Sequence, residues 1–365
     1  MEFGMFFLLQ YPEGKKRDDQ VFHEAMEQIL AAEELGYAAV WLAEHHFSGH
    51  GICGSPLLLA AAAATRTKRV RLGTAISTLP FAHPVRLAEE AAVIDILSNG
   101  RLNFGVGRGY QKQEYEGFEI SQEESHGRFY EALDLILRAW TQPRVTFEGK
   151  FYHTYRLAVL PKPAQKPHPP ILVATVTPSS AVFAARRGFP LIAGFGSLAE
   201  LIESRTAYAQ TWADAGRHPE EIRYFLNRRV FVADSVEEAR HETEDSLLWG
   251  NVYQGRYAGP VAPGEPEHPE FMGYGPRWDR LLQTSGDAFF DEWGLLGDPE
   301  TIVQRIQRFE QTLGVTHLMC NMAFGWIEHA KVLRSMERFA REVMPHFQHS
   351  AISDQQSGKS RHPGI

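Results

Sequence analysis

Apolar segments with the character of strands alternate with amphipathic helical segments along the 365 residues, and this order restricts the fold more than any other feature. Eight strands are predicted, over residues 2–9, 38–42, 70–76, 101–106, 171–175, 189–193, 222–232 and 316–320. A helix follows each strand, and strict alternation of this kind requires a parallel sheet. Eight such units favour an α/β fold closed as a (β/α)8 TIM barrel, with functional residues at the carboxyl ends of the strands.

Two insertions interrupt this alternation, at about 143–170 and 235–295. The first is predicted to contain a hairpin around Glu148-Gly149 and a proline-rich connector, and the second a helix followed by a segment rich in Gly, Pro and aromatic residues. A long segment without regular structure inside a domain is either disordered or a working lid, so a lid-like segment is expected after the seventh strand. We expect one domain over 1–347 and a polar, disordered tail over 348–365.

Charge and apolar content exclude several classes of partner. The formal net charge is −8 and no basic run exceeds three residues, which argues against binding of nucleic acid. The longest apolar run, Leu57–Ala64, is too short to span a membrane, and residues 1–4 lack the pattern of a signal peptide. Cys53 and Cys320 cannot by themselves build a disulfide framework or a zinc cluster. The sequence therefore predicts a cytoplasmic enzyme.

A histidine pair follows the second strand, within Glu44-His45-His46-Phe47. Adjacent side chains leave a strand on opposite sides, so His45 and His46 are not expected to bind one metal ion together, and no metal site is predicted. Either a histidine here makes a structural hydrogen bond, or one histidine at the barrel mouth acts as an acid, a base or a hydrogen-bond donor.

Two other segments at strand ends have the character of phosphate sites. In residues 105–110 the glycines allow a close approach to the backbone, and Arg108 supplies a positive charge suited to phosphate unless it forms a structural ion pair. Residues 174–180 place hydroxyl side chains at the start of a helix. Hydroxyls and backbone N–H groups at such a helix start bind anions, and ordinary capping by Thr177 or Ser179 explains the same residues.

Small residues also end the third strand, at residues 73–77. They leave room for a flat ligand against the backbone, although packing explains Gly73 equally well. A phosphate site, a slot for a flat ligand and a histidine are thus predicted on neighbouring strand ends of one barrel. A phosphorylated aromatic cofactor fits this arrangement better than a sugar or a metal.

At these residues the sequence resembles the bacterial luciferase-like family of flavin-dependent monooxygenases, most closely its luciferase α subunits. The resemblance runs through about residue 345 and is carried by residues 1–4, 40–47, 73–75, 79–86 and 98–109. It implies a (β/α)8 barrel that binds reduced FMN at the carboxyl ends of the strands and receives it from a separate flavin reductase. The absence of a nicotinamide-binding fingerprint agrees with such a two-component system.

The resemblance also implies roles for single residues. His45 occupies the position of the catalytic histidine, and Arg108 that of a phosphate-binding arginine. Ala75-Ile76 matches a non-proline cis peptide bond that supports the flavin ring. Further contacts with the cofactor are predicted at Gly107, Thr175, Val176, Ser179 and Ser180.

Three positions depart from the luciferase α subunit. Gly107 stands where that subunit has a reactive cysteine, and Thr175 replaces an acidic residue. Before the helix at 123–140 the chain reads Ser-His-Gly-Arg, where the luciferase has a phosphate-binding arginine. Either Arg128 takes that role one residue later or it does not, and His126 is the neighbouring candidate. FMN binding is still expected after these changes, whereas light emission is not.

The predicted reaction is oxygenation of a small organic substrate by reduced FMN and O2 through a flavin C4a-peroxide, with His45 stabilising the peroxide or moving a proton. The alternative is a deazaflavin-dependent oxidoreductase that transfers hydride without oxygen. A non-catalytic flavin-binding subunit and a metal-dependent hydrolase are further hypotheses. A homodimer is expected from the resemblance, although core packing explains the alanine-rich helices equally well.

Overall fold

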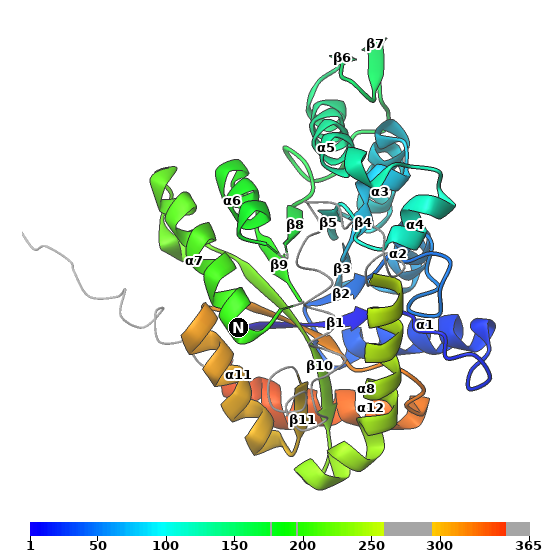
Figure 1. Cartoon of the computed structure of the whole chain (residues 1–365), viewed down its shortest axis with the longest axis vertical. Coiled ribbons are helices and arrows are strands. Elements are labelled where there is room, and N and C mark those ends of the chain that lie inside the picture. Colours follow the sequence, from blue (N-terminus) through cyan, green and yellow to red (C-terminus); the bar gives the residue numbers. More distant parts are fainter. Residues whose placement is uncertain (176, 195, 259–293, 348–365) are drawn as a thin grey trace, which may run out of the picture.

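The computed structural model describes residues 1–175, 177–194, 196–258 and 294–347, with residues 251–258 described by their backbone alone (Figure 1). The predictions for Val176, for residues 259–293 of the second insertion and for the tail fall outside the described residues. None of the helices in the described ranges combines the length and the apolar character that a bilayer crossing requires.

Eight parallel strands close into a barrel, which confirms the predicted (β/α)8 fold. Their order is β10-β12-β1-β2-β3-β5-β8-β9, and β9 pairs back with β10. The bounds of each strand lie within two residues of the predicted ones. The strands are β1 (Glu2–Phe7), β2 (Ala39–Leu42), β3 (Arg71–Thr74), β5 (Leu102–Gly107), β8 (Ile171–Thr175), β9 (Leu191–Ala193), β10 (Tyr224–Val232) and β12 (His317–Asn321).

Two additional short strands were not expected. The strand predicted at 70–76 ends two residues early, as β3 ends at Thr74. A separate strand β4 (Ser77–Thr78) follows it and pairs with β5. β11 (Gly294–Gly297) pairs with the far end of β10. Four residues that follow a segment rich in Gly, Pro and aromatic residues show no alternating pattern, so β11 could not be predicted from the sequence.

The helices cover the outside of the barrel, with α6, α7 and α11 on one side and α1, α2 and α3 on another (Figure 1). Helix starts follow ordinary capping chemistry: the Ser197 hydroxyl accepts from the Glu200 N–H in a capping box, and Asp298 caps α11. The helices are α1 (Asp18–Glu34), α2 (Pro56–Arg66), α3 (Pro84–Leu97), α4 (Lys112–Gly117), α5 (Ser125–Thr141), α6 (Pro178–Arg187), α7 (Leu198–Asp214), α8 (Val236–Ala258), α11 (Pro299–Leu313) and α12 (His329–Arg338).

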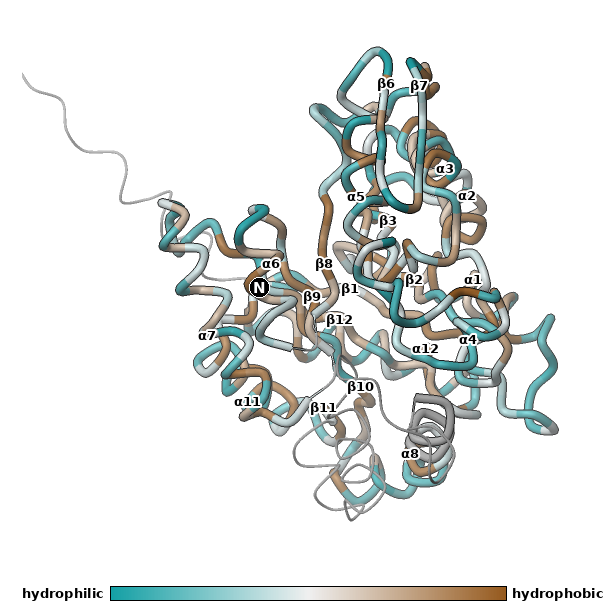
Figure 2. The backbone as a smooth tube through the Cα atoms, turned by 45° about the horizontal axis from the view of Figure 1, so that its top comes forward, coloured by the Kyte–Doolittle hydropathy of each residue, from teal (hydrophilic) through white to brown (hydrophobic). Residues whose placement is uncertain are grey.

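The predicted hairpin of the first insertion forms from β6 (Val145–Glu148) and β7 (His153–Leu157). The connector after it is tied to α3, because Gln165 donates from its backbone and side-chain nitrogens to the buried Asp95 carboxylate at 2.8 and 2.6 Å. This anchor directs the chain into β8, one of the most hydrophobic strands in Figure 2.

The barrel interior is filled by its own small apolar cluster. Trp41 packs edge-on against Phe225 with ring centroids 5.3 Å apart. A Cβ on Gly73 would lie 2.1 Å from the Trp41 ring, so the absence of a side chain at this position makes room for that ring. This agrees with the packing role, one of the two that were predicted for Gly73. The cluster consists of Ala39, Trp41, Leu172, Ile192, Phe225 and Met319. It fills the barrel below the strand ends, and the open space therefore lies at the carboxyl ends.

Candidate active site

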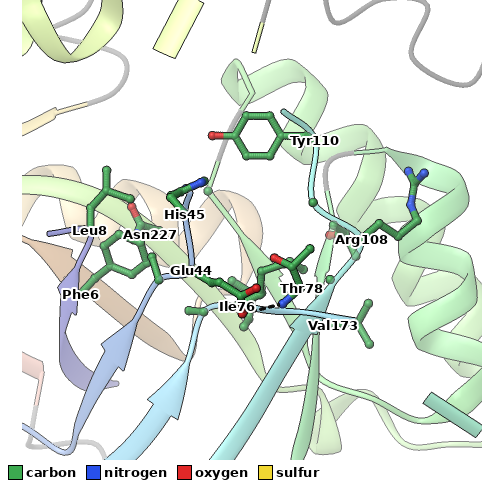
Figure 3. Close-up of a pocket in the computed structure, with 18 of the residues that line it drawn as sticks. Phe6, Leu8, Glu44, His45, Ile76, Thr78, Arg108, Tyr110, Val173 and Asn227 are labelled. Atoms are coloured by element: carbon green, nitrogen blue, oxygen red, sulfur yellow. Dashed lines mark hydrogen bonds between the residues drawn. The ribbon is translucent and has the colours of Figure 1, made fainter. Parts of the chain in front are cut away.

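A cavity of about 190 Å³ opens at the carboxyl ends of the barrel strands. All eight barrel strands contribute to its wall (Figure 3). The lining residues lie on β1, β8, β9, β10 and β12 and at or just after the ends of β2, β3 and β5. Of the predicted site residues, His45, Ala75, Ile76, Gly107, Arg108, Thr175 and Ser180 line it. The barrel thus brings together predicted residues that are up to 135 positions apart in the chain, from His45 to Ser180.

His45 follows β2 and is held by a carboxylate that the sequence did not reveal. Its Nδ1 lies 2.9 Å from Glu114 Oε1, and the same oxygen accepts the His46 backbone N–H at 3.0 Å. The Glu114 side chain is only 2% exposed. Because a carboxylate accepts and does not donate, this contact favours the tautomer of His45 that carries its proton on Nδ1, and Gln111 Nε2 also lies 3.2 Å from Nδ1. In that tautomer Nε2 is left for the cavity.

His46 turns away from His45, as predicted. Its Nε2 lies 3.3 Å from Glu44 Oε1, while the other oxygen of Glu44 accepts the Thr78 backbone N–H at 3.1 Å. Burial raises the pKa of the Glu44 carboxyl. Within the described residues, His, Cys, Asp and Glu side chains form no group of three or more that could hold a metal ion.

A second histidine of the cavity, His50, was not predicted. Its ring is 1% exposed and meets the His45 ring edge-on at 4.7 Å, and its Nε2 lies 3.4 Å from the Tyr110 hydroxyl. Burial, together with the nearby His45 and Arg229, lowers the pKa of His50 well below its usual value. It is therefore a neutral hydrogen-bonding group at physiological pH.

One end of the cavity has the properties of a phosphate site. Arg108 reaches toward the start of α5, where its Nη1 donates to the Ser125 hydroxyl at 3.3 Å. The Thr175 hydroxyl is buried and lacks a hydrogen-bond partner. Ser180 lies in the first turn of α6, which Thr177 caps at 3.4 Å from the Ser180 N–H. A guanidinium, an unsatisfied hydroxyl and the positive end of a helix suit a phosphate.

Two predicted contacts lie apart from this end. The Ser179 hydroxyl meets Thr177 Oγ1 at 3.0 Å and does not line the cavity. Arg128 pairs with Glu124 at 2.8 Å, and its guanidinium lies 4.9 Å from the Phe151 ring centroid. Arg128 is also absent from the cavity wall. Contacts of Ser179 and Arg128 with the cofactor therefore stay predictions, and the observed positions of these side chains do not favour them.

The predicted slot for a flat ligand lies beside the phosphate end. The Ala75-Ile76 peptide bond is cis, as the resemblance implied. A Cβ on Gly107 would lie 2.1 Å from Ile76 Cδ1 and 3.6 Å from Ala174 Cβ, so the backbone at Gly107 stays bare. A cysteine at this position would not fit unless Ile76 moved. Small residues and a bare backbone next to a phosphate site fit FMN.

The first 317 residues match the family model described as luciferase-like monooxygenase. The chain belongs to this family. The flavin-dependent trigonelline monooxygenase oxygenase component of Acinetobacter baylyi is 28% identical to this luciferase-like chain over 96% of the chain and 97% of the relative. The expectation of a flavin-dependent monooxygenase is thereby confirmed.

Solved structures agree with the fold of this luciferase-like chain. The crystal structure of monooxygenase RslO1 from Streptomyces bottropensis has a TM-score of 0.82 and 29% identity, covering 95% of this chain and 100% of that one. The oxygenating constituent of 3,6-diketocamphane monooxygenase from Pseudomonas putida, solved with FMN, has a TM-score of 0.79 and 22% identity, covering 94% and 98%. An F420-dependent secondary alcohol dehydrogenase has a TM-score of 0.74 and 18% identity, covering 94% and 98%. At 22% and 18% identity, the last two structures show only that their fold is the same as that of this chain.

Proposed function

We propose that this chain is the oxygenase component of a two-component system, in which a separate flavin reductase supplies reduced FMN and the oxygenase uses it with O2 to oxygenate a small organic substrate. One observation carries the proposal: a phosphate site, a bare-backbone slot and a carboxylate-held histidine share one cavity. When bound, reduced FMN supplies the electrons that activate O2, so the protein needs only to bind, orient and shield.

The phosphate end would hold the FMN phosphate through Arg108, the Thr175 hydroxyl and the first turn of α6. Charge-assisted hydrogen bonds from a guanidinium are strong and directional, so this end sets the position of the whole cofactor. Ile76 and Gly107 would then lie beside the ring, where the missing side chain at Gly107 leaves the space.

His45 is the residue that would hold or move a proton at the reacting end. Glu114 fixes the protonated Nδ1, so Nε2 is free to accept or donate toward the cavity. Because the partner is a carboxylate, it also stabilises the imidazolium that forms when Nε2 takes up a proton.

Apolar side chains along the cavity wall would keep water from the reacting atoms. Phe6, Leu8, Ile76, Val173 and Ile192 line the cavity. A dry wall strengthens each electrostatic contact inside the site and limits side reactions of reactive oxygen species.

We also propose that the oxygenase is a cytoplasmic homodimer. Its exposed apolar side chains include Leu58 on α2 and Val93 and Leu97 on α3, which are 74%, 41% and 52% exposed. The helices α2 and α3 lie in contact with one another, so these side chains belong to neighbouring surface elements. Clustered apolar side chains on a surface mark contact sites between proteins.

Chemically reduced FMN tests the proposed function without any reductase. The protein is mixed anaerobically with reduced FMN, air is admitted, and the return of oxidised-FMN absorbance is followed together with O2 consumption. We expect bound FMN to reoxidise at a rate different from that of free FMN while O2 is consumed. Absence of FMN binding, or oxidation of a substrate without O2 consumption, would contradict the proposal, and the second result would favour the deazaflavin alternative.

A further inference from the structure

Two asparagines lie in the cavity wall directly beyond the apolar cluster that fills the barrel. Phe225 of β10 and Met319 of β12 belong to that cluster. Alternate residues of a strand point to the same side, so Asn227 is the next inward residue after Phe225. In the same way, Asn321 follows Met319, and both asparagines line the cavity. Bulky apolar side chains usually fill a barrel interior, so packing does not explain two amides in this layer.

One polar atom of each amide lacks a partner. Asn321 is 4% exposed, and its Oδ1 is buried without a hydrogen bond to any described residue. Asn227 Nδ2 is also buried with no partner in the described part of the chain. An unsatisfied buried amide atom destabilises the folded protein, and native proteins contain few of them. Two such atoms on residues of one cavity wall therefore indicate a polar ligand.

These amides lie across the barrel from the phosphate end. β12 and β5 are opposite one another, because three strands separate them in either direction around the barrel. Figure 3 likewise shows Asn227 with Phe6 on the opposite side of the cavity from Arg108. β1, the neighbour of β12, and the residue after it add the apolar side chains of Phe6 and Leu8 to the wall. The asparagines are therefore placed to contact a second molecule beside the cofactor.

The two unsatisfied atoms differ in what they bind. Asn321 Oδ1 accepts a hydrogen bond, so it suits an N–H or O–H group and disfavours a carboxylate, an ester or a ketone. Asn227 Nδ2 donates, so it suits a carbonyl and disfavours an ammonium. Asn227 pairs in register with Met319, two positions before Asn321, which puts the Cα atoms of the two asparagines roughly 8 Å apart. A group with its donor and its acceptor on different atoms fits this separation better than a single hydroxyl does.

We propose that these asparagines form the substrate site and that the substrate is a neutral molecule with a carboxamide or lactam group. Its N–H would donate to Asn321 Oδ1 and its carbonyl would accept from Asn227 Nδ2, while Phe6 and Leu8 would contact its apolar part. The inference rests on the proposed function, because it requires FMN to occupy the Arg108 end. The flavin ring itself carries an N–H between two carbonyls, so each experiment also measures the Kd for FMN.

The first test uses protein saturated with oxidised FMN, so that the phosphate end is filled. Benzamide is compared with acetophenone, and 2-piperidone with cyclohexanone, because each ketone keeps the carbonyl and the size of its amide but lacks the N–H. Benzyl alcohol represents a single hydroxyl, and calorimetry gives each Kd. We expect amides to bind at least about tenfold more tightly than the matched ketones and the alcohol.

Three outcomes of this test would contradict a proposal. Binding of neither amide, or binding of a ketone or of the alcohol as tight as that of the amides, would overturn the inference. Failure of FMN to bind at all would instead contradict the proposed function.

Variants assign the two contacts separately. Asn321→Leu should remove the preference for amides and leave the Kd values of the ketones unchanged. Asn227→Leu should weaken amides and ketones alike by about tenfold, since both carry the carbonyl. Both variants should keep the Kd for FMN. Gln304→Leu, which removes an exposed amide of α11, is the control and should change none of these values.

Both asparagine variants should also fold, because each removes an unsatisfied buried atom, and thermal denaturation checks this. If one of them does not fold, the comparison of amides with ketones in the wild type still decides. Retention of the amide preference in folded Asn321→Leu would overturn the inference. A Kd for FMN raised about tenfold in either variant would also overturn it, because the asparagines would then bind the flavin ring.

Discussion

His45 and Glu114 are 69 residues apart in the chain and 2.9 Å apart in the structure, and at the scale of single residues this contact governs the chemistry of the site. A histidine at a barrel mouth can rotate and change its tautomer. The Glu114 carboxylate restrains both motions. Its Oε1, which contacts His45 Nδ1, also accepts the His46 backbone N–H and is thereby held in place.

Loss of the Glu114 carboxylate should therefore affect turnover rather than cofactor binding. In Glu114→Ala we expect kcat for product formation to fall by about 10–100-fold, with the Kd for FMN unchanged. Glu114→Gln keeps an acceptor oxygen for His45 and should recover part of the loss. Glu116→Ala, an exposed position of the same helix, is the control. An unchanged kcat in Glu114→Ala would remove this positioning role.

The two arginines predicted to bind phosphate can be separated by the same kind of comparison. Arg108 lines the cavity, whereas Arg128 pairs with Glu124 outside its wall. A hydrogen bond to a charged group contributes about 1.5–3 kcal/mol, so Arg108→Met should raise the Kd for FMN by about 10–100-fold. Arg128→Met should leave the Kd within about twofold, as measured by fluorescence titration. Comparable weakening in both variants would place Arg128 at the phosphate.

At the scale of elements, single side chains join helices to the barrel. Glu33 at the end of α1 accepts three backbone N–H groups, from Lys68, Arg69 and Val70, at 2.7 to 3.1 Å. It thereby ties α1 to the turn that leads from α2 into β3. Burial alone would raise the pKa of the Glu33 carboxyl, but these N–H donors lower it below its usual value.

This anchor predicts a pH-dependent contribution to stability. Because the folded-state pKa of Glu33 is lowered, its stabilisation is present above the unfolded-state pKa of about 4.3 and is lost as the pH falls through the folded value. Glu33→Ala should lower the free energy of unfolding by about 1 kcal/mol at pH 7 and by less near pH 3, in urea titrations. The exposed neighbour Glu34→Ala should change little, and an equal loss at both pH values would contradict the anchor.

At the scale of the whole molecule, the proposed homodimer requires a contact surface between two barrels. If α2 and α3 form the contact, a charge on their exposed apolar surface should separate the copies. Leu58→Glu should sediment as a monomer at micromolar concentration while the wild type sediments as a dimer. Leu160→Glu is a matched control, because Leu160 is 63% exposed on the connector before β8. A monomeric wild type, or dissociation by Leu160→Glu alone, would contradict the homodimer through these helices.

The sequence by itself determined the barrel, because alternating strands and helices leave few ways to bury their apolar faces. It also placed His45, Arg108 and the Ala75-Ile76 bond at strand ends, since these belong to short contiguous motifs. Motifs are local, and their chemistry can be recognised without knowing what lies across the barrel.

Only the tertiary structure decided the partners of these residues. Arg228 and Arg229 are adjacent in β10, yet Arg228 lies 5.1 Å from the Phe309 ring of α11 while Arg229 lies beside Gly250 of α8. Two adjacent arginines in a sequence do not indicate which helix each side chain contacts, because the strand register and the packing of the helices determine those contacts. Glu114 and His50 carry no motif for the same reason: their roles come from contacts across the barrel mouth, and such contacts exist only once the distant segments have packed together.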